Sequence, residues 1–309
     1  MKQYWILLII GFLGLGDVSC TSYKEKDNQK QDTPLRGEIT ISADESFKPI
    51  IDELVKVYES NNRGTQINVE YKPEADCVKD LWNDSIRMVI STIELTEPER
   101  LSVVDSLRTV VKQLAVARDA IAVIVNPRSS DSLFNMAEIK EILTGKNVKG
   151  LFPVFDGVKA TSTVRYIMDS VLKGEKLTEK AVATRTSDSV INYVARTPLA
   201  VGFIGVSWIG NQDDREQLSF LKKVKIAHLE SNDTPGKYIL PLQANLYMKK
   251  YPMTRDLVYI LKESHKGLGW GFGNFMSGEI GQLIFKRAYL MPGLKSFRLR
   301  PIQLNEDEK

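Results

Sequence analysis

The sequence is poor in the residues that build disulfide scaffolds and metal centres. Its 309 residues include two cysteines, Cys20 and Cys77, and two histidines, His228 and His265. If Cys20 carries a lipid, Cys77 has no partner, which excludes a disulfide scaffold and a multi-cysteine zinc site. Neither histidine has metal-ligand spacing, so we expect neither a metal nor a cofactor. The sequence also lacks a Gly-x-Ser-x-Gly elbow and a paired-carboxylate spacing, so we do not expect an enzyme.

Long basic blocks, internal repeats and low-complexity tracts are also missing. The net charge of +3 is small, which gives nucleic-acid binding little support. A hydrophobic content of 43% and a charged content of 26% are typical of a soluble globular protein. The length suffices for about two domains.

One apolar run stands out near the N-terminus, from Tyr4 to Leu15 after Lys2. It is too short for a comfortable membrane span, and its charged start and small-residue end are typical of a secretory signal. The segment Val18-Ser19-Cys20 resembles the end of a bacterial lipoprotein signal, in which the cysteine is lipidated. An ordinary signal peptide cleaved nearby is the alternative. We therefore expect an extracytoplasmic protein anchored to a bacterial membrane through Cys20.

Strand and helix patterns alternate along the rest of the chain, which predicts an α/β fold with parallel strands. Residues 37–42, 66–71 and 87–91 show strand patterns, and an amphipathic helix follows the first of them. The apolar run Ala120–Val125 predicts a strand buried on both faces. Residues 238–248 are interpreted as a strand that returns to the first part of the fold. The stretch 257–290 is interpreted as largely helical, with a break around Gly267–Gly273.

Three short polar patches stand where helices should begin. Helix N-termini attract anions because they offer unpaired N–H groups and the positive end of the helix dipole. Ligands of α/β sheets also lie at the carboxyl ends of strands, where these patches converge. The candidate ligand-binding residues are Ser46, Phe47 through its backbone N–H, Asp76, Ser91, Thr92, Thr161, Ser162 and Thr163.

Each of these residues also has a purely structural interpretation. Ser46 and the Thr161–Thr163 run are typical helix-capping residues. Glu74 is interpreted as a carboxylate favoured by a helix N-terminus. Asp76 is left open between that role and accepting a proton from a protonated anion. Asp156 is left open between orienting Arg165 and forming its own turn.

Five stretches, taken in order, resemble the phosphate-binding component of phosphate ABC transporters across about residues 38–295. They are "ITISADESFKPIIDELVKVYE", "DAIAVIVNP", "NMAEIKEILTGK", "TPLAVGFIGVSWI" and "GFGNFMSGEIGQLIFKRAYLMPG". The resemblance implies a type II periplasmic-binding-protein fold, in which two α/β lobes close on a ligand at the hinge. Each lobe would be a mostly parallel sheet flanked by helices, and two crossover strands would join them, at Ala120–Val125 and near Leu240–Tyr247.

The composition of the chain and the resemblance together suggest how it is divided. The expected parts are a signal peptide (1–20), a disordered tether (21–36), lobe 1 (37–122 and 236–300), lobe 2 (123–235) and a C-terminal tail (301–309). We expect a monomer.

The family places an arginine shortly before a Gly-Ser-Gly-Thr turn, and the matching stretch here is "FDGVKATSTVRY". Gly157 stands roughly where that arginine would lie, and Arg165 is the candidate to replace it from the following helix. The resemblance implies capture of a small oxyanion, phosphate above all, for delivery to an ABC transporter permease. The alternatives are a binding protein or sensor for another anion or small organic acid, and a surface interaction protein that kept the fold but lost the ligand.

Overall fold

The computed structural model describes residues 32–157, 161–211 and 213–294. Apart from Asp32, these residues belong to one compact unit, Thr33–Lys309. The predicted signal peptide with Cys20, most of the predicted tether and the predicted tail 301–309 lie outside the described residues. Within the described ranges, every helix is too short or too polar to cross a membrane.

The order of strands in the main sheet sets the architecture. The strands are β1 (Arg36–Asp44), β2 (Gly64–Lys72), β3 (Ile86–Ser91), β4 (Val111–Val125), β5 (Leu133–Phe134), β6 (Phe152–Phe155), β7 (Val182–Ala183), β8 (Ala200–Gly205), β9 (Lys225–Ile226), β10 (His228–Glu230), β11 (Tyr238–Ile239), β12 (Thr254–Lys262) and β13 (Met291–Pro292). A 10-stranded sheet follows the order β2-β1-β3-β12-β4-β8-β6-β7, and β9 and β13 also pair with β4. A 3-stranded sheet contains β11, β10 and β5.

Helices lie between the strands in the chain. They are α1 (Lys48–Asn61), α2 (Glu74–Lys79), α3 (Glu97–Leu107), α4 (Met136–Thr144), α5 (Ser162–Tyr166), α6 (Ser187–Arg196), α7 (Arg215–Leu221), α8 (Gln243–Tyr247), α9 (Leu268–Ser277) and α10 (Glu279–Arg287). Short 3-10 turns are η2 (Glu45–Phe47), η3 (Asp80–Trp82) and η5 (Val206–Trp208), and η4 (Ile167–Leu172) is a π-helical turn that continues α5.

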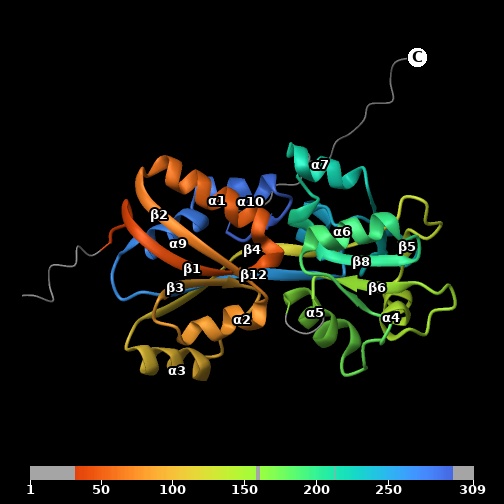
Figure 1. Cartoon of the computed structure of the whole chain (residues 1–309), viewed down its shortest axis with the longest axis horizontal. Helices are drawn as coiled ribbons and strands as arrows, with labels where there is room; N and C mark the ends of the chain where they lie inside the picture. Colours follow the sequence, from red (N-terminus) through yellow and green to blue (C-terminus); the bar gives the residue numbers. More distant parts are fainter. Residues whose placement is uncertain (1–31, 158–160, 212, 295–309) are drawn as a thin grey trace, which may run out of the picture. The chain divides into compact units, whose positions relative to one another are not determined.

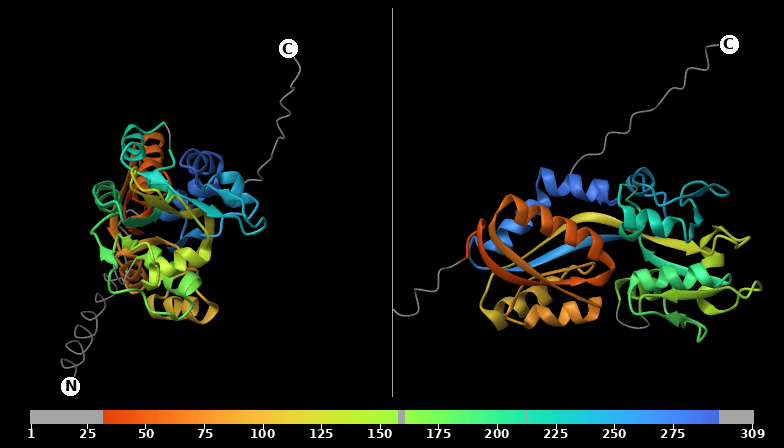
Figure 2. Two further views of the ribbon diagram at one scale, coloured as in Figure 1. Left: turned by 90° about the vertical axis from the view of Figure 1, so that its right-hand side faces the viewer. Right: turned by 45° about the horizontal axis from the view of Figure 1, so that its top comes forward.

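The sheet has two halves that share two long strands. The first half contains β1, β2 and β3, and the second half contains β6, β7 and β8, each half being parallel within itself. β4 and β12 pair antiparallel and run from one half into the other (Figure 1). Helices lie on both faces of each half, with α1 and α10 opposite α2 and α3 in the first (Figures 1 and 2). This arrangement confirms the expected two-lobe α/β fold.

Apolar periodicity explains why these segments pack as they do. In α1 the residues spaced for one helix face, including Ile51, Leu54 and Tyr58, are buried against the sheet. The run Ala120–Val125 in β4 is buried on both faces, as predicted for a central strand. One hydrophobic cluster contains Leu54 of α1 and Leu143 of α4, so a continuous core joins the two halves.

The predicted return strand near Leu240–Tyr247 is wrong. Residues 243–247 form the short helix α8, and the chain returns to the first half through β12, Thr254–Lys262. Pro241 lacks an N–H to donate to a sheet ladder, which stops strand pairing after β11. The β-branched and aromatic residues at 258–260 suit the centre of a sheet, so a stretch interpreted as helical is a strand.

Helical structure in the 257–290 stretch begins only at α9. Its glycines, which we interpreted as a helix break, lie inside the helix because neighbouring backbone comes close. A Cβ at Gly271 would lie 2.8 Å from Pro34 Cα, so only glycine lets α9 pack against the segment before β1.

Candidate functional site

A tight turn after β1 brings polar groups to the carboxyl end of the strand. The Asp44 carboxylate accepts a hydrogen bond from Ser46 N (3.1 Å), which starts the η2 turn. The Ser46 hydroxyl then donates to Asp156 Oδ2 (3.2 Å), which follows β6 in the second half. The Ser46 carbonyl accepts from Trp208 Nε1 (2.9 Å). The first predicted ligand residue therefore faces the other half of the sheet.

The N-terminus of α5 lies opposite this turn. Thr161 caps the helix by accepting from Val164 N (3.3 Å), as expected of a hydroxyl residue at a helix start. The Ser162 hydroxyl donates to the Ser46 hydroxyl (3.4 Å), and both side chains are fully buried. Two helix starts that are 116 residues apart in the chain thus meet, as the sequence predicted.

Arg255 of β12 is the buried cation of this region. Its Nε donates to Asp119 Oδ2 (3.0 Å) on β4, where the two residues are paired in register. Its Nη1 donates to the hydroxyls of Ser162 (2.7 Å) and Thr163 (3.3 Å). The guanidinium lies over the Phe47 ring, 4.8 Å from its centroid. Nη2 has no hydrogen-bond partner among the described residues.

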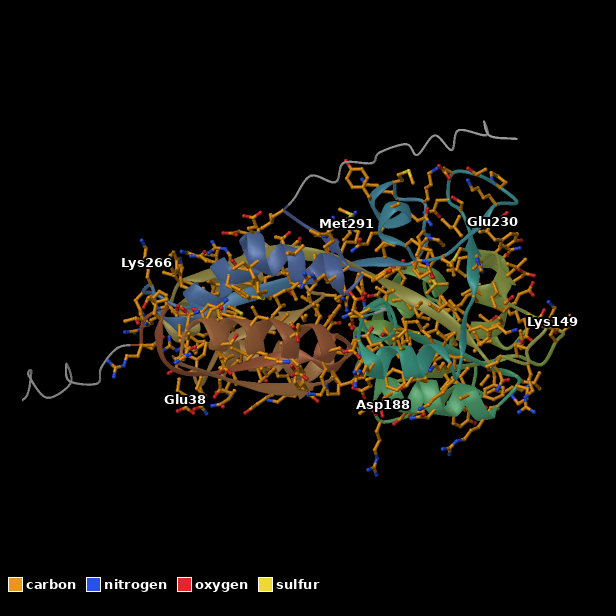
Figure 3. All side chains as sticks on the ribbon, turned by 90° about the horizontal axis from the view of Figure 1, so that it is seen from above. Glu38, Lys149, Asp188, Glu230, Lys266 and Met291 are labelled. Atoms are coloured by element: carbon orange, nitrogen blue, oxygen red, sulfur yellow. The ribbon has the colours of Figure 1, made fainter. Side chains whose placement is uncertain are left out.

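A helix start in the second half completes the arrangement. Ser187, the first residue of α6, donates from its hydroxyl to Asp156 Oδ2 (3.2 Å) and to Glu45 Oε2 (3.1 Å). Figure 3 shows the neighbouring Asp188 at the end of α6 nearest the first half, whereas Lys149 lies at the far end of the second half. We call Ser46, Asp156, Ser162, Ser187 and Arg255 the buried cluster.

The cluster is packed closely on the sheet side. A Cβ at Gly205, the last residue of β8, would lie 3.1 Å from Arg255 Nη2 and 3.2 Å from the Ser46 carbonyl oxygen. Glycine at this position therefore leaves room for the guanidinium between the two halves.

A second polar group joins α2 to α5 beside the buried cluster. Glu74 is 1% exposed and accepts from Thr92 N (2.9 Å), from the Thr92 hydroxyl (2.6 Å) and from Arg165 Nε (2.6 Å). Arg165 Nη2 also donates to the Thr92 hydroxyl (2.6 Å). We call Glu74, Thr92 and Arg165 the clamp.

Ser91 and Asp76, which are also predicted site residues, hydrogen-bond to neither group. Ser91 is buried, and its hydroxyl accepts from Ile93 N (3.2 Å), which turns the chain after β3. Asp76 pairs with Lys79 of the same helix (2.7 Å), and its side chain is 47% exposed. Phe47 is fully buried, with its ring beneath Arg255, which agrees with the expected core position of that ring.

Sequence reasoning missed Arg255, Ser187 and the role of Glu74. The signal for Arg255 was a charged residue at the start of an apolar run, matched by Asp119 at the start of another. Because the run that follows Arg255 was interpreted as helical, the pairing of β4 with β12 was not foreseen. Asp156 lies against Ser46 and Ser187 rather than against Arg165, which is held by Glu74.

Burial shifts the proton affinities of the acidic groups here. Desolvation first and the nearby Glu74 second raise the pKa of Asp44 to about 7, against the opposing charge of Arg255. Desolvation and the neighbouring Asp156 also raise the pKa of Glu45 to about 7. The pKa of Asp156 is raised by burial, although the hydroxyl of Thr161 opposes the shift. Asp44 and Glu45 can therefore hold or release protons close to neutrality.

The arrangement suits binding of a small polar solute. Buried hydroxyls, one guanidinium with an unpaired Nη2 and carboxyls of raised pKa supply hydrogen-bond donors and acceptors at one point between the halves. Such groups replace the hydration shell of a small ion when the two halves enclose it.

Residues 28–279 match the model of a PBP superfamily domain. No curated protein sequence matches the chain significantly. A solved structure from Clostridium perfringens, assigned to the phosphate ABC transporter substrate-binding proteins and holding phosphate, is 19% identical; the alignment covers 83% of this chain and 99% of that one, with a TM-score of 0.69. An ABC-type phosphate transport receptor from Vibrio cholerae is 18% identical over 83% of this chain and 100% of its own, with a TM-score of 0.60.

The same fold also occurs in a regulator. The OxyR2 regulatory domain from Vibrio vulnificus is 9% identical, over 79% of this chain and 96% of its own, with a TM-score of 0.52. At these identities the likeness establishes the fold, and the chemistry must be argued from the residues of this chain.

Proposed function

The chain belongs to the PBP superfamily, and we propose that it captures a small oxyanion, phosphate above all, between its two halves. The observation that carries this proposal is the buried Arg255, whose Nη1 donates to hydroxyls at the start of α5 while Nη2 is unpaired. A guanidinium and hydroxyls at helix starts are typical ligands of a phosphate group. We therefore propose that Arg255 binds the anion in place of the family's arginine, which would lie near Gly157.

The acidic neighbours favour an anion that itself carries a proton. Asp44 and Asp156 lie beside the hydroxyls, and a carboxylate there repels a fully deprotonated ion. A monohydrogen or dihydrogen phosphate can donate its proton to such a carboxylate, whereas sulfate and molybdate have none to donate near neutral pH. We therefore infer a preference for phosphate over both of them.

We further propose the setting in which the protein works. The fold of ABC-importer substrate-binding proteins supports an extracytoplasmic, monomeric binding protein that delivers its ligand to a permease. The proposed anchor is a lipid on Cys20. The proposed lobes are 37–122 with 236–300, and 123–235, closing about β4 and β12.

Thermal unfolding of the purified protein with added ions tests the proposal. A ligand that binds only the folded state stabilises it by about 2.7 kcal/mol at one hundred times its Kd. We expect phosphate to raise the Tm and sulfate, molybdate and small carboxylates to raise it much less. If none of these ions shifts the Tm, the protein does not capture small oxyanions.

The Arg255→Lys variant tests the residue that carries the proposal. Lysine keeps the charge but loses the planar fork, so we expect phosphate affinity to fall at least about tenfold. The matched control is Arg118→Lys, because Arg118 also pairs across β4 and β12, with Asp256 (2.7 Å), but on a partly exposed side chain. Isothermal titration calorimetry should show unchanged phosphate binding in the control. Equal losses in both variants would contradict a ligand role for Arg255.

A further inference from the structure

A large groove lies directly beside the buried cluster. Its volume is about 840 Å³, and it is bounded by α2 from the first half and by α5 and η4 from the second. Figure 1 shows α2 and α5 on the same side of the sheet, and the clamp joins them. Pockets that hold small organic ligands typically measure about 300–1,000 Å³. The groove therefore has the size of an organic ligand rather than of an inorganic ion.

The walls of the groove are mainly apolar. Both halves contribute to them, and the apolar side chains are Ala75, Val78, Ile93, Val164, Met168 and Leu177. Apolar side chains cannot donate hydrogen bonds to the oxygens of an inorganic ion. They stabilise a bound hydrocarbon by removing it from water.

Two residues belong both to the groove and to the surroundings of the buried cluster. Thr161 lines the groove and directly precedes Ser162, whose hydroxyl accepts from Arg255. Glu74 lines the groove, and its charge acts on both Asp44 and Arg255. The Thr161 side chain also hydrogen-bonds to Asp156, so the groove borders the buried cluster.

The charges around the groove define what the extension can be. Arg165 is held by Glu74 and Thr92 and lies 3.7 Å from Asp169, so its charge is already compensated. Asp169 and Glu179 add negative charge to the lining. These carboxylates disfavour a second anionic group, so the extension should be apolar and uncharged.

We propose that the preferred ligand is an organic phosphate or phosphonate with one anionic head, bound at the buried cluster, and an apolar body, bound in the groove. The inference rests on the proposed function, because it assigns the head to the same oxyanion site. The inference differs from the proposed function in one respect: the tighter ligand is a phosphate monoester or a phosphonate, and not the free ion.

Calorimetric titration of the full chain with a graded series of ligands tests this inference. The series is inorganic phosphate, methyl phosphate, butyl phosphate and phenyl phosphate. Each buried methylene should tighten binding by about fourfold, so butyl phosphate should bind at least about tenfold more tightly than inorganic phosphate.

A variant that fills the groove separates the two parts of the site. Ala75→Trp places a large ring in the groove from an exposed position on α2 and should remove the gain from butyl and phenyl groups while leaving phosphate binding unchanged. The control is Ala137→Trp, an exposed alanine on α4 that does not line the groove. It should keep the full dependence on chain length.

The outcomes separate this inference from the proposed function. Binding of phosphate without any gain from the alkyl or phenyl group would overturn the inference and leave the proposed function in place. A gain that persists in Ala75→Trp would also overturn it, because the apolar body would then lie elsewhere. If no member of the series binds, the proposed function fails, and the inference fails with it.

Discussion

At the scale of single residues, one guanidinium from a central strand joins hydroxyl groups at the start of a helix, because Arg255 Nη1 donates to Ser162 and Thr163. Ser46, Ser162 and Thr163 could be found because polar residues at helix starts leave a local signal in the sequence. Arg255 leaves no such signal, because its position opposite Asp119 depends on the pairing of two strands whose residues are 136 apart. Glu74 was likewise given a local role, although its carboxylate reaches Arg165 across the two halves.

The buried carboxyl groups predict how stability depends on pH. The pKa of Asp44 rises from about 3.8 in the unfolded chain to about 7 in the folded protein, mainly through burial. The folded protein therefore holds this proton more tightly, so the stability contribution is complete below about pH 4 and is lost as the pH rises through about 7. Glu45 acts in the same direction.

Asp44→Asn should reduce this dependence. The amide oxygen can still accept from Ser46 N, but the side chain no longer ionises. Relative to the unchanged protein, the variant should gain about 1 kcal/mol or more in free energy of unfolding between pH 5 and pH 8. Urea unfolding of both proteins at several pH values measures this difference in the free energy of unfolding. Asp233→Asn is the control. The hydrogen bond from Ser231 lowers the pKa of Asp233 to about 2, so this carboxyl group titrates below the tested pH range. Parallel profiles for Asp44→Asn and the unchanged protein would refute the prediction.

At the scale of elements, the sequence predicts strands and helices well where one periodicity dominates. The run Ala120–Val125 and the amphipathic α1 were identified because burial on two faces and on one face give different patterns. β12 was missed because a short apolar run followed by glycines fits either a buried strand or a helix. Its β-branched and aromatic residues favoured the strand, and Pro241 argued against strand pairing of the residues that follow β11.

The clamp between α2 and α5 predicts a cooperative contribution to closure. Arg165→Met leaves the buried Glu74 carboxylate without its cation, although Thr92 still donates to it. We expect the free energy of unfolding to fall by about 1–3 kcal/mol and ligand release to become faster. A double-mutant cycle with Glu74→Gln isolates the pairwise term.

Arg100→Met is the matched control for the clamp. Arg100 pairs with Glu97 within α3, on an exposed surface, so its removal should change neither stability nor ligand release appreciably. Stopped-flow measurement of ligand release distinguishes the two variants. If Arg165→Met and Arg100→Met release ligand at the same rate, the clamp does not hold the halves together.

At the scale of the whole molecule, the resemblance predicted the two-lobe fold correctly. The sequence alone did not show that the core is continuous, because that depends on which side chains meet across β4 and β12. Leu54 of α1 and Leu143 of α4 belong to one hydrophobic core, although they come from different halves. A shared core favours unfolding of both halves in one step.

Truncation of a core residue in either half tests this cooperativity. Leu143→Ala should destabilise the protein by about 2–5 kcal/mol and lower its Tm by about 2–4 °C for each kcal/mol. The transition should remain single in differential scanning calorimetry. Leu54→Ala, in the other half, should move the same transition. Two peaks, of which Leu143→Ala moves only one, would show that the halves unfold independently.

The pairing of Ala120 with Thr254 places the exit and the re-entry of the chain side by side on one antiparallel ladder. Everything between these two points, including the whole second half, is in effect an insertion with neighbouring ends. Such a module can be exchanged by recombination without cutting any other strand. A chimera that takes residues 121–253 from a relative would place both splice points beside the Ala120–Thr254 pair. Inheritance of one half at a time would then give this architecture a simple route to new ligand preferences.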